Sequence, residues 1–186
     1  MLESTELLYA YSQGYFPMAV PEDNNEIFWF KPDMRGIIPL DEFHVSKNLR
    51  RLFNKHYFDL RINGDFEGTM RACTEREDTW ISEDIITSYC KLHEMGYGFS
   101  FETWRNGKLT GGLYGVIIGK AFFGESMFHR ETNASKIALI FLVQFLKDND
   151  FQLLDTQYIN DHLLQFGAKE ITNEEYEKIL ARALES

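Results

Sequence analysis

The stretch GFSFETWRNGKLTGGLYGVIIGKAFFGESMF, residues 98–128, carries the strongest structural signal in the chain. Phe99, Phe101 and Thr103 alternate with the residues between them, a period of two that is typical of a strand with one buried face. Asn106-Gly107 follows, the strongest short signal for a hairpin turn. We therefore predict an antiparallel meander of three strands, over about 99–104, 108–118 and 120–128.

The residues after the meander predict helices around one further strand. Residues 134–147 are apolar on nearly every side of the expected helix, so that helix should be buried. A strand is expected over 151–154, a short helix over 161–166 that ends at Gly167, and a terminal helix over 174–184.

The residues before the meander predict shorter elements. In chain order these are a helix over 4–13 ended by Gly14, an apolar loop over 15–18, strands at 27–30 and 37–38, a helix over 47–54 capped by Ser46, a half-buried strand over 58–62, a helix over 66–73 and a helix capped by Ser82. Helices, then a meander, then helix–strand–helix predict an α/β (α+β) fold with a mixed sheet and helices on its faces.

Composition narrows the class of protein. The 186 residues are 44% hydrophobic and carry a net charge of -10, so a packed core is expected and nucleic acid can bind only through a local basic patch. Cys73 and Cys90 are predicted to be buried reduced thiols, and the scattered histidines predict no metal site. The start of the chain has no signal-peptide pattern and no stretch suits a membrane span, so we expect a cytoplasmic protein.

Two places combine polar groups with apolar surroundings. Glu125 ends an apolar strand; it either binds a cation or amine, or is a strand-end carboxylate that reaches solvent. Asp155 and Gln157 have strand spacing and would share one face at a strand end, where α/β sheets place their sites. The alternative is that both are turn and cap residues for the next helix.

One helix is unusually basic for so acidic a chain. Lys47, Arg50, Arg51 and Lys55 crowd the helix over 47–54, where they form either a phosphate-binding patch or a solvated face. Trp80 is either a stacking platform for a base or a core anchor.

Taken together, these segments resemble the leucyl/phenylalanyl-tRNA–protein transferase family, in order and spacing over nearly the whole chain. The matching stretches are Tyr11–Pro17 (YSQGYFP), Trp29–Arg35 (WFKPDMR), His44–Ser46 (HVS), Thr79–Ile81 (TWI), Gly111–Gly115 (GGLYG), Gly124–Phe128 (GESMF), Asn133–Lys136 (NASK), Asp155-x-Gln157 and Asn160–His162 (NDH).

The resemblance implies a small N-terminal region, 1–40, followed by a GNAT-like acyltransferase domain, 41–186. It implies that Asp155 and Gln157 are the catalytic pair and that Glu125 is the active-site glutamate. The pocket for the transferred side chain falls on Leu113, Phe122, Met127, Leu139, Leu142 and Leu146. Trp80 and Met18 fall where aromatic residues contact the tRNA's terminal adenosine, although members commonly have Trp in place of Met18, and Lys47, Arg50, Arg51 and Lys55 fall on the tRNA patch.

The function so implied is transfer of Leu or Phe, with Met also plausible, from aminoacyl-tRNA to the N-terminal α-amine of acceptor proteins. Acceptors that begin with Lys or Arg are expected, and their modification would mark them for degradation. The donor is an activated ester, so we expect no cofactor. Gln157 would orient the amine and be polarised by Asp155. Glu125 would position the same amine. The alternatives are an acyl-CoA N-acyltransferase and a non-catalytic relative that binds tRNA or protein N-termini.

Overall fold

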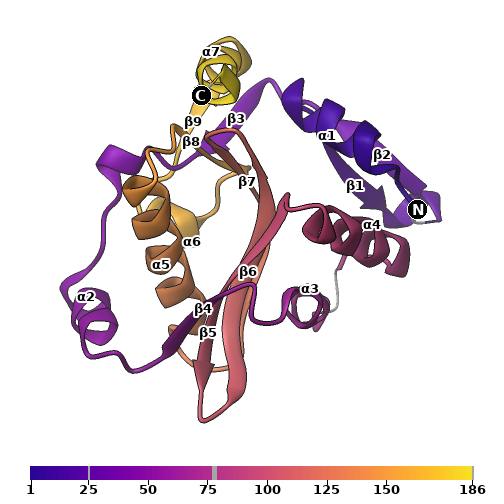
Figure 1. The fold of residues 1–186 in the computed structure, drawn as a ribbon. Coiled ribbons are helices and arrows are strands. Elements are labelled where there is room, and N and C mark those ends of the chain that lie inside the picture. Colours follow the sequence, from indigo (N-terminus) through magenta and orange to yellow (C-terminus); the bar gives the residue numbers. More distant parts are fainter. Residues whose placement is uncertain (25, 77–78, 186) are drawn as a thin grey trace.

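The computed structural model describes residues 1–24, 26–76 and 79–185 and shows a sheet covered by helices on both faces (Figure 1). The helices are α1 (Ser4–Ser12), α2 (Lys47–Asn54), α3 (Phe66–Cys73), α4 (Glu83–Glu94), α5 (Ala134–Asp148), α6 (Asp161–Leu164) and α7 (Asn173–Glu185). The strands are β1 (Phe16–Val20), β2 (Glu26–Phe30), β3 (Met34–Ile37), β4 (Asp59–Ile62), β5 (Gly98–Arg105), β6 (Lys108–Ile118), β7 (Ala121–His129), β8 (Leu153–Gln157) and β9 (Lys169–Thr172).

The large sheet has seven strands in the order β4-β5-β6-β7-β8-β3-β9. Only the β7–β8 pair is parallel among these neighbours, so the sheet is mixed, as predicted. The predicted meander is β5–β6–β7. Its first turn has Asn106 and Gly107 at φ 52° and 74°, the pair of left-handed residues that a type I′ hairpin turn needs.

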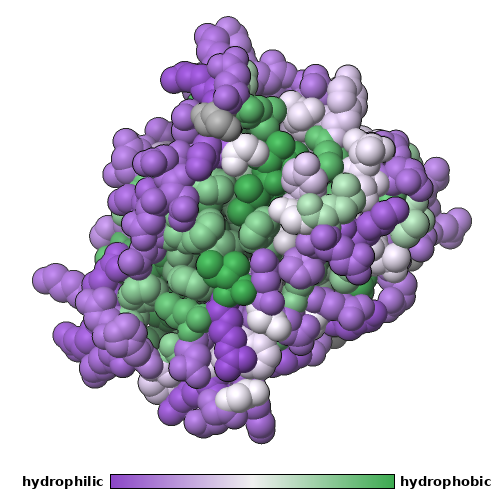
Figure 2. Space-filling view, viewed as in Figure 1, coloured by the Kyte–Doolittle hydropathy of each residue, from purple (hydrophilic) through white to green (hydrophobic). Residues whose placement is uncertain are grey.

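The sheet separates two hydrophobic clusters. On one face α5 packs over Leu113 and Phe122, with α2 beside α5, and on the other face α3 and α4 pack over Tyr114 and Phe123 (Figure 1). Leu113 and Tyr114 are neighbours on β6 and belong to opposite clusters, because successive strand side chains alternate between faces. Figure 2 shows hydrophobic residues gathered in the middle of the viewed face, with hydrophilic residues around them.

The N-terminal region begins with α1 and the separate β1–β2 hairpin, which add Leu7, Tyr11 and Phe16 to the cluster under α4. The predicted loop over 15–18 is wrong, because Phe16–Val20 pairs with Glu26–Phe30 as an antiparallel strand. The proposed boundary at residue 40 stays a prediction. β3, which precedes it, pairs with β8 and β9 in the large sheet.

Other predictions differ in detail. β9 was not predicted, β3 begins at Met34 and not at Ile37, and β8 runs two to three residues later than the expected 151–154. Cys73 is buried as predicted, whereas Cys90 is only half-buried. Among the described helices, none has the length and apolar character needed to cross a membrane.

Close contact between β6 and α5 depends on a glycine. A Cβ at Gly111 would lie 2.6 Å from the Cβ of Ala134, at the start of α5. We expect Gly111→Ala to lower the free energy of unfolding by about 1–3 kcal/mol, the usual cost of overpacking. Urea denaturation measures this, with the exposed Lys108→Ala on the same strand as control; equal stabilities of the two variants would contradict the prediction.

Candidate active site

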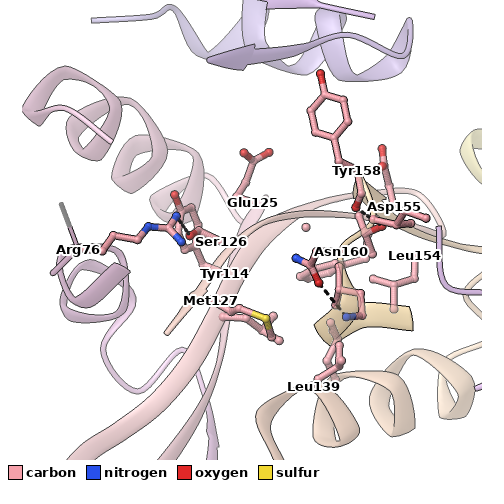
Figure 3. Close-up of a pocket in the computed structure, with 17 residues that line it drawn as sticks. Arg76, Tyr114, Glu125, Ser126, Met127, Leu139, Leu154, Asp155, Tyr158 and Asn160 are labelled. Atoms are coloured by element: carbon pink, nitrogen blue, oxygen red, sulfur yellow. Dashed lines mark hydrogen bonds between the residues drawn. The ribbon is translucent and has the colours of Figure 1, made fainter. Parts of the chain in front are cut away.

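A pocket of about 240 Å³ lies where the sheet opens (Figure 3). β7 and β8 pair only through Ala121–Phe123 and Leu153–Asp155, and beyond these residues no further pairing joins the two strands. The pocket occupies this opening, between β7 at Gly124–Met127 and the segment from Leu154 to Asn160. A parallel pair that stops early thus produces a cavity at the strand ends.

A β-bulge presents Glu125 to this opening. Tyr114 pairs with Ser126 and Gly115 pairs with Gly124, so Glu125 is the extra residue on β7. Such a bulge re-aims a side chain, and bulges are common next to active sites. Gly115 permits it, since a Cβ there would lie 2.3 Å from the carbonyl oxygen of Phe123.

The side of the pocket toward α5 is apolar. Five of the six predicted pocket side chains line it, namely Leu113, Phe122, Met127, Leu139 and Leu142. Leu154, Ile159 and Leu163 complete this wall. Leu146 does not line it, because this residue lies one turn further along α5, toward the end where β7 and β8 are still paired, and is fully buried.

The polar end of the pocket holds Glu125 between hydrogen-bond donors. The hydroxyl of Tyr11 donates to Oε1 of Glu125 and also contacts the hydroxyl of Tyr89, while Nε2 of Gln157 donates to Oε2 at 3.4 Å. Burial raises the pKa of Glu125 to about 8, although the Tyr11 hydrogen bond favours the ionised form. This carboxyl group therefore exchanges its proton near neutral pH.

Asp155 is fully buried and accepts four hydrogen bonds. Arg35 donates from Nε at 3.1 Å and from Nη2 at 2.7 Å, and the hydroxyl of Tyr176 donates at 2.6 Å. The fourth comes from the backbone N–H of Gln157 at 2.7 Å. Gln157 has φ 65°, a left-handed conformation that is uncommon outside glycine. Asp155 thus holds the main chain of Gln157 in this conformation and does not contact its side-chain amide.

Comparison with known proteins shows the family to which the chain is similar. Residues 37–181 match the family model described as leucyl/phenylalanyl-tRNA protein transferase, and residues 2–33 match the N-terminal domain of the same family. The leucyl/phenylalanyl-tRNA–protein transferase of Paramagnetospirillum magneticum is 52% identical over 182 residues, which is 96% of this chain and 87% of that protein.

The chain belongs to this family. It is therefore an aminoacyl-tRNA–protein transferase, as the resemblance implied. Among solved structures, that of L-PGS from Bacillus licheniformis is 13% identical, with a TM-score of 0.43 over 86% of this chain and 55% of that one.

Sequence reasoning missed several residues of the transferase's site. Arg35 is buried and pairs with Asp155, and its guanidinium also lies over the rings of Tyr176 and Phe16, at 4.3 and 4.9 Å. Its Nη1 donates to the carbonyl oxygen of Gly14 at 2.6 Å. Arg35 ends the WFKPDMR stretch that carried part of the resemblance, but only the fold shows its partner, which lies 120 residues away.

The residues predicted to bind tRNA lie in two places. Trp80 and Met18 both pack, half-buried, against the cluster on the α3–α4 side of the sheet. Lys47, Arg50, Arg51 and Lys55 line one open groove on α2, with Phe43, His44 and Asn54, on the α5 side. Within 1–24, 26–76 and 79–185, none of these four cations is in an ion pair with a carboxylate. In the same ranges, no three His, Cys, Asp or Glu side chains could hold a metal ion.

The raised pKa of Glu125 predicts how stability depends on pH. Between about pH 4.5 and 8 the folded protein keeps a proton on Glu125 that the unfolded chain releases, so rising pH favours unfolding. Glu125→Gln removes this term. We expect the free energy of unfolding of the wild type, relative to Glu125→Gln, to fall from pH 5 to pH 8 in urea denaturation. A constant difference across this range would show that Glu125 is not protonated in the fold.

Proposed function

We propose that this transferase moves leucine or phenylalanine from aminoacyl-tRNA to the N-terminal α-amine of an acceptor protein. The observation that carries the proposal is the pocket: an apolar chamber of about 240 Å³ whose polar end holds Glu125, to which Gln157 donates a hydrogen bond. An amino acid with an apolar side chain fits such a chamber, and its reactive ester would lie beside the groups that can orient an amine.

Size and hydrophobicity would select the donor. The chamber wall consists of Leu, Phe and Met side chains, and an apolar pocket distinguishes one methylene by only about 1–3 kcal/mol. Leucine, phenylalanine and methionine are therefore all substrates under this proposal, while charged amino acids are excluded by the cost of burying their charge.

The chemistry needs little acid–base help. The ester bond is already activated, and an N-terminal α-amine has a pKa of about 7.7–8.0, so a useful fraction of it, roughly a tenth to a sixth, is neutral at pH 7. The amine nitrogen attacks the ester carbonyl, the bond to the ribose oxygen breaks, and the ribose oxygen takes up the proton that the amine loses. Holding the reactants together can supply roughly 7–11 kcal/mol of the acceleration.

Glu125 and Gln157 would orient the amine. Because Nε2 of Gln157 donates to Glu125, the amide oxygen Oε1 of Gln157 remains as an acceptor for an amine N–H. Glu125 has a pKa of about 8, close to that of the amine, so the two groups can share a proton. Asp155 acts through the backbone of Gln157, which revises the expected polarisation of the side-chain amide.

The acceptor and the tRNA use the outer surfaces. The net charge of -10 favours acceptors that begin with Lys or Arg, and adding Leu or Phe to them would mark them for degradation. The α2 groove concentrates four cations on one open surface and would hold the tRNA backbone. Trp80 and Met18 would contact the terminal adenosine. The cytoplasm is the expected location.

A radiolabel-transfer assay tests the proposal. Purified protein is mixed with peptides that begin with Arg, Lys or Ala and with tRNAs charged with Leu, Phe, Met or Asp. We expect transfer of Leu, Phe and Met, but not of Asp, to the basic peptides. No transfer from any charged tRNA would favour the non-catalytic binder, and stabilisation by CoA in a thermal-shift experiment would favour the acyl-CoA N-acyltransferase.

The pocket wall predicts how donor choice can be changed. Leu142 lines the apolar side and is almost fully buried. We expect Leu142→Phe to shrink the chamber and lower the ratio of Phe to Leu transfer, and Leu142→Ala to raise that ratio. The alanine variant should also lose about 2–5 kcal/mol of stability. Leu146→Ala, which truncates a buried residue outside the pocket, is the control. An unchanged ratio in both Leu142 variants would remove this residue from the donor site.

A further inference from the structure

Arg76 reaches the pocket from the α3–α4 side. Its side chain is exposed, lines the pocket and donates from Nη2 to the hydroxyl oxygen of Ser126 at 3.0 Å (Figure 3). Ser126 follows Glu125 on β7, so the guanidinium lies close to the polar end of the pocket. The proposed function gives Arg76 no role.

In the described part of the chain, no carboxylate pairs with Arg76. The acidic residue before it, Glu75, is bound by Arg130 at 2.6 and 3.2 Å. The neighbouring Arg71 behaves in the usual way for a surface arginine and pairs with Glu67 and Glu83. Among the described residues Arg76 makes one hydrogen bond, from Nη2 to Ser126, so its remaining donors can serve a ligand with negative charge.

A second polar group on this side lacks a partner. The hydroxyl of Tyr114 is fully buried, lines the same pocket and has no hydrogen bond within the described residues. Leaving a buried hydroxyl unsatisfied is costly, which points to a polar ligand group that completes its hydrogen bonding.

We propose that Arg76 binds the phosphodiester that joins the terminal adenosine of the tRNA to the preceding nucleotide, with Ser126 beside it and Tyr114 facing the polar atoms of the same nucleotide. This inference rests on the proposed function. The planar fork of an arginine matches two phosphate oxygens. Trp80, which would contact that adenosine, lies four residues from Arg76 between α3 and α4.

The basic groove on α2 cannot bind this phosphodiester when the adenosine lies beside Trp80. Its residues pack on the α5 side of the sheet, whereas Trp80 and Tyr114 belong to the cluster on the α3–α4 side. Long-range attraction to the tRNA body and local binding of its 3′ end are thus assigned to separate cations on opposite faces.

Three donors of increasing length test the inference. Phenylalanyl-adenosine has no phosphate, the phenylalanyl ester of cytidylyl-adenosine has one phosphodiester, and phenylalanyl-tRNA has the complete backbone. KM and kcat are measured for each donor with one Arg-initiated peptide. The enzymes are the wild type, Arg76→Ala, Arg76→Lys, the double variant Arg50→Ala/Arg51→Ala, and Arg71→Ala as the control arginine.

We expect Arg76→Ala to raise KM roughly 10- to 100-fold for the dinucleotide ester and the tRNA, the usual effect of losing a charged hydrogen bond. KM for phenylalanyl-adenosine, and kcat, should stay within about twofold, because that donor has no phosphate to lose. For the dinucleotide ester and the tRNA, the KM of Arg76→Lys should fall between those of the wild type and Arg76→Ala, since lysine keeps the charge without the planar fork. The Arg50→Ala/Arg51→Ala double variant should raise KM only for the tRNA donor. Arg71→Ala should change KM for none of the three donors.

Equal increases in KM for all three donors, or an increase confined to the peptide, would overturn the inference and assign Arg76 to the adenosine or to the acceptor. An unchanged KM for the dinucleotide ester would also overturn it. Failure of the wild type to transfer from any donor would instead overturn the proposed function, and this inference with it.

Discussion

The buried ion pair between Arg35 and Asp155 joins four segments that are far apart in the sequence. Arg35 lies on β3 and reaches Asp155 on β8, the carbonyl oxygen of Gly14 after α1, and the ring of Tyr176 on α7. Two fully buried charges cost several kcal/mol each in lost hydration, so they are tolerated only with complete hydrogen bonding. Here the carboxylate accepts four hydrogen bonds. Removing either charge would leave the other unpaired, and this ties the N-terminal region and the last helix to the strand that carries the site.

The pair also fixes the shape of the site. Asp155 is the last residue of β8 that pairs with β7, and its carboxylate then holds the backbone of Gln157 at φ 65°. On the facing strand, the bulge at Glu125 breaks the regular alternation next to the same point. The two strands separate between these anchors, so the pocket contacts both clusters of the core: an apolar wall toward α5, and Tyr114 and Arg76 on the opposite side.

The elements that the sequence predicted correctly are those that depend on residues close together along the chain. The hairpin at Asn106-Gly107 and the caps Ser46 and Ser82 are local, and each forms as expected, with Ser46 accepting from Leu49 and Ser82 from Ile85. The mixed sheet followed from the order of such elements. β9 was missed because four residues, only one of them buried, carry no usable period.

The parts of the site that could not be predicted depend on contacts across the chain. The bulge at Glu125 requires the register between β6 and β7, and the burial of Arg35 requires strands 120 residues apart to meet. The family resemblance identified Asp155 and Gln157 from their motif, but their spacing alone could not show that the Asp155 carboxylate accepts a hydrogen bond from the backbone N–H of Gln157. Tyr11 and Tyr89 likewise enter the site only because α1 and α4 pack together beside β7.

These features fit an enzyme whose donor is already activated. Asp155 lines the pocket, but its carboxylate, in the one fully buried ion pair of the described chain, accepts four hydrogen bonds and holds Arg35, Tyr176 and the backbone of Gln157 in place. Glu125 is the pocket acid whose pKa is raised, to about 8, and it is hydrogen-bonded by a tyrosine and an amide rather than paired with a charge of opposite sign. A buried ion pair that holds the main chain, next to a site that carries little charge, favours placement of the substrates over acid–base chemistry. For attack of a neutral amine on an ester, placement is the larger contribution that a protein can make.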